Sequence, residues 1–275
     1  MANILPKEKQ VMAIGALVEG ASIRSIERLT GIHGDTIGRL ALRVGQSCEV
    51  ILDQKMRGLN CTKIQCDEIW GFVGKKQRNV KPSDSKEVGD VWTFVAIDAE
   101  TRIVPAYLVG KRDAYSANCF MDDLAGRLNN KVQISTDALP AYREAVERGF
   151  GTNADYGQIV KTYSAKEVEE RRYSPPDILK IKRTVVSGDP HLRSISTSYI
   201  ERQNLTMRMH MRRLTRLTNA FSKKLDNFKA AVALHFAYYN FVRVHRSLRM
   251  TPAMVGEVTK TIWTIEDLVD GNIKP

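Results

Sequence analysis

The sequence lacks the features that mark disulfide-rich, zinc-ribbon and membrane-spanning proteins. Its four cysteines are scattered and form no Cys-x-x-Cys pair, which argues against a disulfide framework and a zinc ribbon. No apolar run approaches the roughly 20 residues that cross a bilayer, and the first residues carry no apolar signal core. We therefore expect reduced thiols, a cytoplasmic location and no membrane partner.

Acidic residues are too few to balance the basic ones. The 275 residues include 42 Lys and Arg against 31 Asp and Glu, so the net charge is +11 at neutral pH. So basic a surface attracts polyanions, and we therefore expect the protein to associate with double-stranded DNA. A hydrophobic fraction of 43% is that of an ordinary folded protein, and this length suffices for two or three structural units.

Residues 1–58 carry a helical pattern with one glycine turn. Apolar residues recur at three- and four-residue steps over 6–18 and 22–29, and a third helix starts shortly after Gly31. This is the arrangement of a helix-turn-helix DNA-binding region; a plain helical cap is the alternative. In this interpretation the apolar side chains that hold the helices together are Ile26, Leu29, Ile37 and Leu40. The side chains that face the major groove are His33, Asp35, Thr36, Arg39 and Arg43.

The pattern then becomes a mixture of strands and helices over residues 59–255. β-Branched and aromatic residues predict strands over 64–73, 91–98, 103–109, 132–136 and 158–163. Apolar periodicity predicts helices over 113–128, 139–148 and 225–242. Three neighbouring strands followed by alternating helices and strands are the chain order of a ribonuclease H-like fold. We therefore predict an α/β protein with a ribonuclease H-like mixed sheet flanked by helices, and an N-terminal all-α helix-turn-helix unit.

Two segments stand outside this pattern. Residues 164–194 lose the periodicity and contain a Pro-Pro break, so we interpret them as an insertion in the catalytic domain that can contact DNA. Residues 256–275 follow the last predicted element and form a C-terminal extension.

Three acidic residues stand at the ends of predicted elements. Asp67 and Asp137 lie in or just after short apolar strands, and Glu201 lies near the start of a helix rich in arginine. On that helix Glu201, Asn204 and Arg208 share one face. The ordinary interpretation is a surface ion pair of Glu201 with an arginine one or more turns later. Carboxylates from two strands and a helix instead indicate a divalent-metal site, and hard oxygen ligands favour Mg²⁺ or Mn²⁺.

Other polar residues near these acids differ in their suitability as metal ligands or as phosphate contacts. Adjacent strand residues point to opposite faces, so Glu68 is a poorer ligand candidate than its neighbour Asp67. Basic and polar side chains are candidates for phosphate contacts. We assign DNA binding to Arg39, Arg43, Lys75, Lys76, Arg202, Asn204, Arg208, Arg212, His245 and Arg246.

Four segments match, in order, the motifs of one enzyme family. They are residues 66–76 (CDEIWGFVGKK), 135–142 (STDALPAY), 199–204 (YIERQN) and 221–248, which ends in HRSL. In these residues the chain resembles the DDE transposases of the insertion-sequence-one type. The resemblance implies that Asp67, Asp137 and Glu201 are the catalytic acids and the metal ligands of a DNA transposase.

Enzymes of this family cut the ends of an insertion sequence and join them to target DNA by metal-dependent phosphoryl transfer. Synapsis of two DNA ends implies a homo-oligomer. Family members often begin with a cysteine zinc ribbon, which this chain lacks, so recognition of the element ends by the N-terminal residues rests on the helix-turn-helix interpretation alone. Two alternatives remain open: a metal-dependent nuclease of the same fold, and a non-catalytic DNA-binding regulator.

Overall fold

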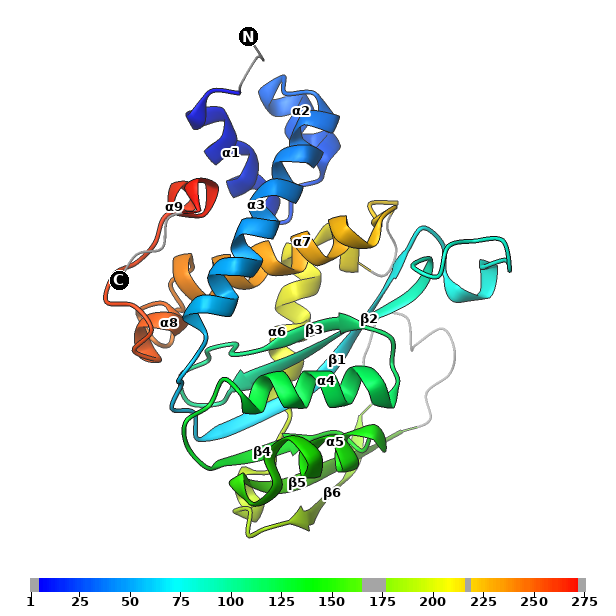
Figure 1. Ribbon diagram of the computed structural model, residues 1–275, viewed down its shortest axis with the longest axis vertical. Helices are drawn as coiled ribbons and strands as arrows, with labels where there is room; N and C mark the ends of the chain where they lie inside the picture. Colours follow the sequence, from blue (N-terminus) through cyan, green and yellow to red (C-terminus); the bar gives the residue numbers. More distant parts are fainter. Residues whose placement is uncertain (1–4, 165–176, 216–218, 272–275) are drawn as a thin grey trace.

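A six-stranded mixed sheet forms the centre of the protein (Figure 1). This computed structural model describes residues 5–164, 177–215 and 219–271. The strands are β1 (Lys63–Val73), β2 (Gly89–Asp98), β3 (Tyr107–Gly110), β4 (Val132–Thr136), β5 (Ala154–Tyr163) and β6 (Ile178–Ser187). The helices of the same region are α4 (Ala114–Ala125), α5 (Ala141–Phe150), α6 (Ser198–His210) and α7 (Leu225–Ala237).

The strand order is β3-β2-β1-β4-β5-β6. Strands β1, β2 and β3 pair antiparallel, β4 and β5 continue parallel to β1, and β6 returns antiparallel to β5. This topology confirms the predicted fold class, an α/β protein with a ribonuclease H-like mixed sheet flanked by helices. No helix within the described ranges is long and apolar enough to span a membrane.

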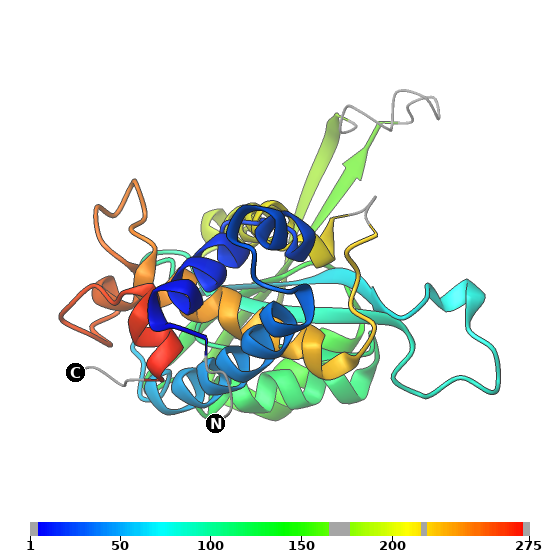
Figure 2. The same cartoon turned by 90° about the horizontal axis from the view of Figure 1, so that it is seen from above.

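Helices cover both faces of the sheet, α4 and α5 on one and α6 and α7 on the other (Figures 1 and 2). Side chains alternate between these faces along each strand. Phe94 of β2 packs against Phe120 of α4, with 5.8 Å between the ring centroids. Gly71 of β1 faces Phe228 of α7, and a Cβ atom there would lie 3.0 Å from that ring. The side chains of Asp67 and Glu68, adjacent on β1, therefore start toward different helical layers, Asp67 toward α6 and α7 and Glu68 toward α4 and α5.

Three helices form the predicted N-terminal all-α unit: α1 (Lys7–Val18), α2 (Ile23–Thr30) and α3 (Gly34–Lys55). The Ser22 hydroxyl caps α2 by accepting a hydrogen bond from the backbone N–H of Ser25. Gly31 ends the helix at φ 69°, a conformation that glycine adopts without a Cβ clash. One expectation is wrong. Leu29 does not hold the helices together but is 81% exposed, because Ile26 is the buried residue of this short helix.

Helix α3 leaves the N-terminal unit and crosses α7 at close range (Figure 1). Gly45 makes the approach feasible, since a Cβ atom at this position would lie 2.2 Å from the carbonyl oxygen of Ala230. Apolar side chains around the crossing are fully buried, including those of Val44 and Val232. The N-terminal helices and the sheet therefore share one continuous hydrophobic core.

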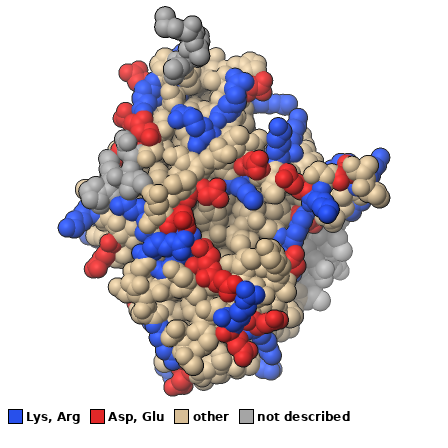
Figure 3. Space-filling view, viewed as in Figure 1, with Lys and Arg blue, Asp and Glu red and all other residues tan. Residues whose placement is uncertain are grey.

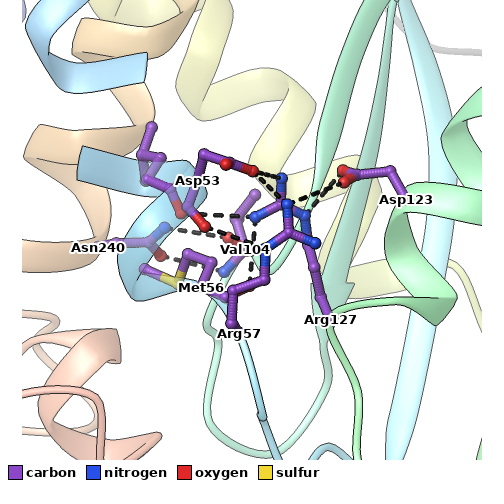
Figure 4. Close-up of polar contacts among 8 residues, drawn as sticks. Asp53, Met56, Arg57, Val104, Asp123, Arg127 and Asn240 are labelled. Atoms are coloured by element: carbon purple, nitrogen blue, oxygen red, sulfur yellow. Dashed lines mark hydrogen bonds and ion pairs between the residues drawn. The ribbon is translucent and has the colours of Figure 1, made fainter. Parts of the chain in front are cut away.

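Arg127, which follows α4, ties the end of α3 to the sheet domain (Figure 4). Its guanidinium pairs with Asp53 at 2.9 Å and with Asp123 at 2.8 Å. It also donates to the carbonyl oxygens of Leu52 and Met56 in the last turn and C-cap of α3, where helical carbonyls run short of N–H partners. The side chain is only 10% exposed. Arg127 thus satisfies carbonyls and carboxylates from two helices at once.

The C-terminal residues pack against both earlier units. The long helix predicted over 225–242 ends as an α-helix at Ala237 and continues as a π-helical turn, η6 (Tyr238–Val242). Within that turn the Asn240 side chain both accepts from and donates to the backbone of Val104 at 3.0 Å. After α8 (Pro252–Val255), the last described helix, α9 (Ile265–Asp270), lies beside α1, with which it forms the ion pair of Lys7 and Asp270.

The predicted insertion at 164–194 is only partly within the described residues, because residues 165–176 lie outside them. No strand was predicted within this insertion, yet residues 178–187 form strand β6. The reason is register: β6 pairs with β5 along its whole length, so the backbone hydrogen bonds compensate for a weak apolar pattern. Together β5 and β6 extend beyond the body of the protein (Figure 2).

Candidate metal centre and nucleic-acid interface

Parallel pairing of β1 and β4 brings two of the predicted acids together. Cys66 on β1 is in register with Thr136 on β4. Asp67 and Asp137 follow these residues, so the two carboxylates lie side by side, where β4 ends next to the middle of β1. One oxygen from each of Asp67, Asp137 and Glu68 lies within 4.8 Å of the others. Two of these three residues, Asp67 and Asp137, were predicted as metal ligands from the sequence.

The position of Glu68 differs from the expectation that it is a poorer ligand candidate than Asp67. Its side chain does start on the opposite face from that of Asp67, but the carboxylate still reaches the group, so opposite faces did not exclude it. Arg112, which precedes α4, explains the placement: its Nε lies 3.1 Å from Glu68 Oε2, and its Nη2 lies 4.0 Å from Asp137 Oδ2. The Arg112 guanidinium in turn lies over the ring of Trp92, 4.9 Å from its centroid.

Asp67 is held from two sides. Its Oδ2 accepts a hydrogen bond from Asn204 Nδ2 of α6 at 2.9 Å, and its Oδ1 accepts one from the backbone N–H of Glu68 at 2.9 Å. Burial raises the pKa of Asp67 to about 7, and the negative charges of Glu68, Asp137 and Glu201 add to this effect. The site therefore brings four carboxylates together, and Asp67 has no ion pair of its own among the described residues.

Glu201 lies in the first turn of α6, close enough to influence Asp67 electrostatically but outside the group of three oxygens. Its carboxylate forms an ion pair with Lys161 of β5 and accepts a hydrogen bond from Thr197 Oγ1 at 2.6 Å. Thr197 is the N-cap residue of α6, and its hydroxyl binds this side chain in place of a backbone N–H. The expected surface pair with a later arginine is therefore replaced by a pair with Lys161.

The donor set fits a hard divalent cation. All candidate ligand atoms of Asp67, Asp137, Glu68 and Glu201 are carboxylate oxygens, which suit Mg²⁺ and Mn²⁺ better than softer metals. Asn204 Oδ1 beside Asp67 is buried and has no hydrogen-bond partner among the described residues. An oxygen of this kind is available to a bound cation or to its water. The residues present are thus compatible with the expected cofactor.

Two arginines of the N-terminal unit were predicted to contact DNA. Arg39 is exposed, and its one hydrogen bond in the described chain is a long one of 3.4 Å to Thr36 Oγ1. Arg43 instead donates to Gln10 Oε1 at 2.7 Å and to the Val269 carbonyl oxygen at 3.5 Å. Arg43 therefore joins α3 to α1 and α9, and Arg39 is the freer of the two.

The loop between β1 and β2 carries two further candidates and projects from the body of the protein (Figure 2). Lys75 Nζ is bound by both carboxylate oxygens of Asp84, at 2.8 and 2.7 Å. Lys76 Nζ lies 5.8 Å from the ring centroid of Trp70 and 6.0 Å from that of Phe72. Lys75 thus shapes the loop, and Lys76 rests on an aromatic surface.

The remaining candidates belong to α6 and to the chain after it. Arg202 and Arg246 are exposed, as is Arg212 in the 3₁₀ turn η5 (Arg212–Leu214). Arg208 donates to the Leu214 carbonyl oxygen at 2.9 Å and so stabilises that turn. His245 is half-buried and hydrogen-bonded to Ser247. Asn204 alone among these residues touches an acid of the site.

Sequence reasoning missed Lys161, Arg112 and the proximity of Glu68. A lysine directly after the apolar pair Ile159 and Val160 of a predicted strand was a usable signal for Lys161. No local pattern marked Arg112, because its role depends on where the loop before α4 meets β4. On the face that carries α4 and α5, basic and acidic side chains alternate rather than forming a surface of one sign (Figure 3).

Comparisons with known proteins return structural likenesses only. No protein-family model matches the chain, and no curated protein matches it in sequence. A piggyBac transposase synaptic complex with hairpin DNA is 8% identical, with a TM-score of 0.44 over 96% of this chain and 69% of the other. The Mos1 strand transfer complex is 12% identical, with a TM-score of 0.35 over 98% and 77%. The Mos1 paired-end complex with left transposon end is 15% identical, with a TM-score of 0.24 over 57% and 60%.

Proposed function

We propose that the protein is a DNA transposase that cuts the ends of an insertion sequence and joins them to target DNA. The observation that carries the proposal is the convergence of Asp67 in the middle of β1 with Asp137 at the end of the neighbouring parallel strand β4, with Glu201 near them on α6. In the DDE transposases that the sequence resembles, acids in these motifs are the catalytic residues. The net charge of +11 supplies the attraction to DNA.

Asp67, Asp137 and Glu201 would hold Mg²⁺ or Mn²⁺, which stabilises the attacking and leaving oxygens of an in-line phosphoryl transfer. The other residues position these acids. Asn204 orients Asp67, Arg112 holds Asp137, and Lys161 holds Glu201 on the β5 side. Because the buried carboxylate of Asp67 lies close to other acids, a bound cation would offset the repulsion among them.

The reaction has two steps of the same kind. A water oxygen bonds to the phosphorus at the element end, and the 3′ oxygen of the element leaves as a free hydroxyl. That hydroxyl then attacks a target phosphodiester and displaces another 3′ oxygen. Arg39, Arg43, Lys75, Lys76, Arg202, Asn204, Arg208, Arg212, His245 and Arg246 are the residues to which we assign the DNA contacts, and pairing of two ends calls for a homo-oligomer.

The test uses Asp137→Asn with DNA that carries the sequences flanking the gene. Asn can still accept the 2.9 Å hydrogen bond that Asp137 Oδ1 receives from the N–H of Leu139, so the loop is preserved. We expect the variant to bind this DNA with unchanged affinity and to lose nicking and joining in Mg²⁺. Asp122→Asn, on the surface of α4, is the matched control and should retain both activities. Normal joining by the Asp137 variant would refute the proposal.

Two further assays separate the alternatives. A pre-cut DNA end with a free 3′ hydroxyl is converted to a strand-transfer product by a transposase but not by a nuclease that only hydrolyses. A non-catalytic regulator binds the DNA and shows no metal-dependent cleavage under any condition. Only the transposase yields both the cleavage product and the joined product.

A further inference from the structure

A group of cations gathers on the side of α6 that does not carry the catalytic acids. Arg102 comes from the turn after β2, Arg202 from α6, and Arg243 and His245 from the chain after η6. Tyr199 and Arg202 are three residues apart and share a face of α6, more than a quarter-turn away from Glu201. Segments far apart in the sequence thus place basic side chains around one part of α6.

Arg102 carries the strongest indication of a ligand. Its Cζ lies 3.4 Å from the ring centroid of Tyr199, so the guanidinium rests against the ring in a cation–π contact. Its Nη1 is buried and has no acceptor in the described chain. The backbone adopts φ 63°, a left-handed conformation that costs about 1 kcal/mol for a residue with a Cβ atom. A glycine would adopt this turn more readily, so the side chain of Arg102 is retained at a cost.

The neighbouring charges are predominantly positive, although Glu100, whose pKa Lys63 lowers most, is near enough to Arg102 for that guanidinium to lower the pKa of Glu100 further. Tyr239 of η6 donates to the Arg102 carbonyl oxygen at 3.0 Å, which places the chain that leads to Arg243 and His245 beside Arg102. In agreement, the pKa of His245 is lowered by burial first and then by Arg102, Arg243 and Arg202. Within the described ranges none of the three arginines forms an ion pair with a carboxylate. The two nearest acids in sequence are already engaged, since Glu100 pairs with Lys63 and Glu201 with Lys161.

We propose that Arg102, Tyr199, Arg202, Arg243 and His245 form a second phosphate-binding surface, here called the Arg102 surface, which holds the backbone of duplex DNA beside the catalytic site. The proposal rests on the proposed function, because that function makes DNA the polyanion at hand. Phosphate oxygens are the acceptors that a stacked guanidinium fork binds best. They would supply the partner that Arg102 Nη1 lacks.

The test is the salt dependence of binding to a random-sequence duplex, measured by fluorescence anisotropy. Each lost phosphate contact lowers the slope of log Kd against log salt by about 0.9. We expect the double variant Arg102→Gln/Arg243→Gln to lose about two units of slope and to bind roughly tenfold more weakly at physiological salt. Arg148→Gln removes one charge from the surface pair with Asp122 on the other face and should leave the slope within about 0.3 of the unaltered protein.

Folding is controlled in two ways. Arg243 also contacts His210 Nε2 at 3.0 Å, so circular dichroism must show that the double variant is folded. Arg202→Gln changes an exposed side chain and should by itself lower the slope by about 0.9. Arg102→Lys keeps the charge and should restore the slope to that of the unaltered protein. An unchanged slope in folded Arg202→Gln and in the folded double variant would overturn the proposal.

The salt-dependence measurement tests the Arg102 surface independently of the transposase proposal. If the slope falls but the unaltered protein never joins DNA in Mg²⁺, the Arg102 surface stands and the enzymatic assignment fails. If joining occurs and the slope is unaffected, the enzymatic assignment stands and the Arg102 surface fails.

Discussion

Asn204 on α6 donates a hydrogen bond to Asp67 on β1, with 2.9 Å between Nδ2 and Oδ2. This contact joins the helix that carries Glu201 to the strand that carries the first acid. The same amide leaves its Oδ1 buried and unpartnered in the described structure. Asn204 therefore lies where it can fix the orientation of the carboxylate and still face a ligand.

Replacing Asn204 by Leu should weaken Mn²⁺ binding by about tenfold, because residues that orient metal ligands commonly contribute 10- to 100-fold to affinity. Isothermal titration calorimetry of the DNA-free protein measures this directly. Asn153→Leu, at an exposed position before β5, is the matched control and should bind as the unaltered protein does. Equal Mn²⁺ affinity in the two variants would show that Asn204 does not support a metal site.

Gly45→Ala should lower the free energy of unfolding by at least about 2 kcal/mol, because a Cβ atom 2.2 Å from the Ala230 carbonyl oxygen forces α3 and α7 apart. Urea denaturation measures the change. Gly38 on the same helix has nothing within 4 Å of a Cβ atom. Gly38→Ala should therefore stabilise the protein by roughly 0.5–1 kcal/mol through helix propensity alone. Similar effects of the two substitutions would contradict the close crossing.

Arg127→Met should destabilise the protein by about 3 kcal/mol, since it leaves two carboxylates and two helix-end carbonyls without their shared donor. The measurement is again the free energy of unfolding in urea. Arg148→Met breaks an ion pair whose side chains are 59% and 40% exposed, and it should cost less than about 1 kcal/mol. A loss below 1 kcal/mol for Arg127→Met would mean that α3 is held by apolar packing alone.

His235 on α7 gives the protein an acid-sensitive stability. Burial lowers its pKa to about 3, and the charges of His210 and Arg243 act in the same direction. The unfolded chain has a His pKa near 6.5, so it binds more protons than the fold below that pH. Stability is therefore full above pH 6.5 and is lost as the pH falls from 6.5 toward 3. Between pH 7.5 and 5 this residue alone should cost the fold about 2 kcal/mol.

Thermal unfolding of His235→Gln over that pH range tests the prediction. The variant should lose about 2 kcal/mol less stability than the unaltered protein between pH 7.5 and 5. His33→Gln, at a side chain that is 73% exposed, controls for the loss of an imidazole. Parallel pH profiles of His235→Gln and the unaltered protein would exclude a neutral buried His235.

Much of the catalytic domain could be predicted because its elements carry strong local patterns. The strand at 132–136 was predicted with the bounds that it has, since a short apolar run between polar turns determines both of its ends. The fold of residues 178–187 could not be predicted in this way. Its apolar side chains are exposed, and only pairing with β5 makes it a strand.

The candidate site likewise combines elements that the sequence predicts with contacts that only the tertiary structure reveals. The strand that contains Asp67, the strand that ends just before Asp137 and the helix that begins before Glu201 follow from the sequence, because hydrophobic periodicity decides which segments become strands and helices. Only the tertiary structure decided that Glu68 joins the acids, that Lys161 holds Glu201, and that Arg43 bonds to Gln10 of α1. Those contacts join residues from separate elements, and their distances depend on strand register and side-chain direction rather than on spacing along the chain.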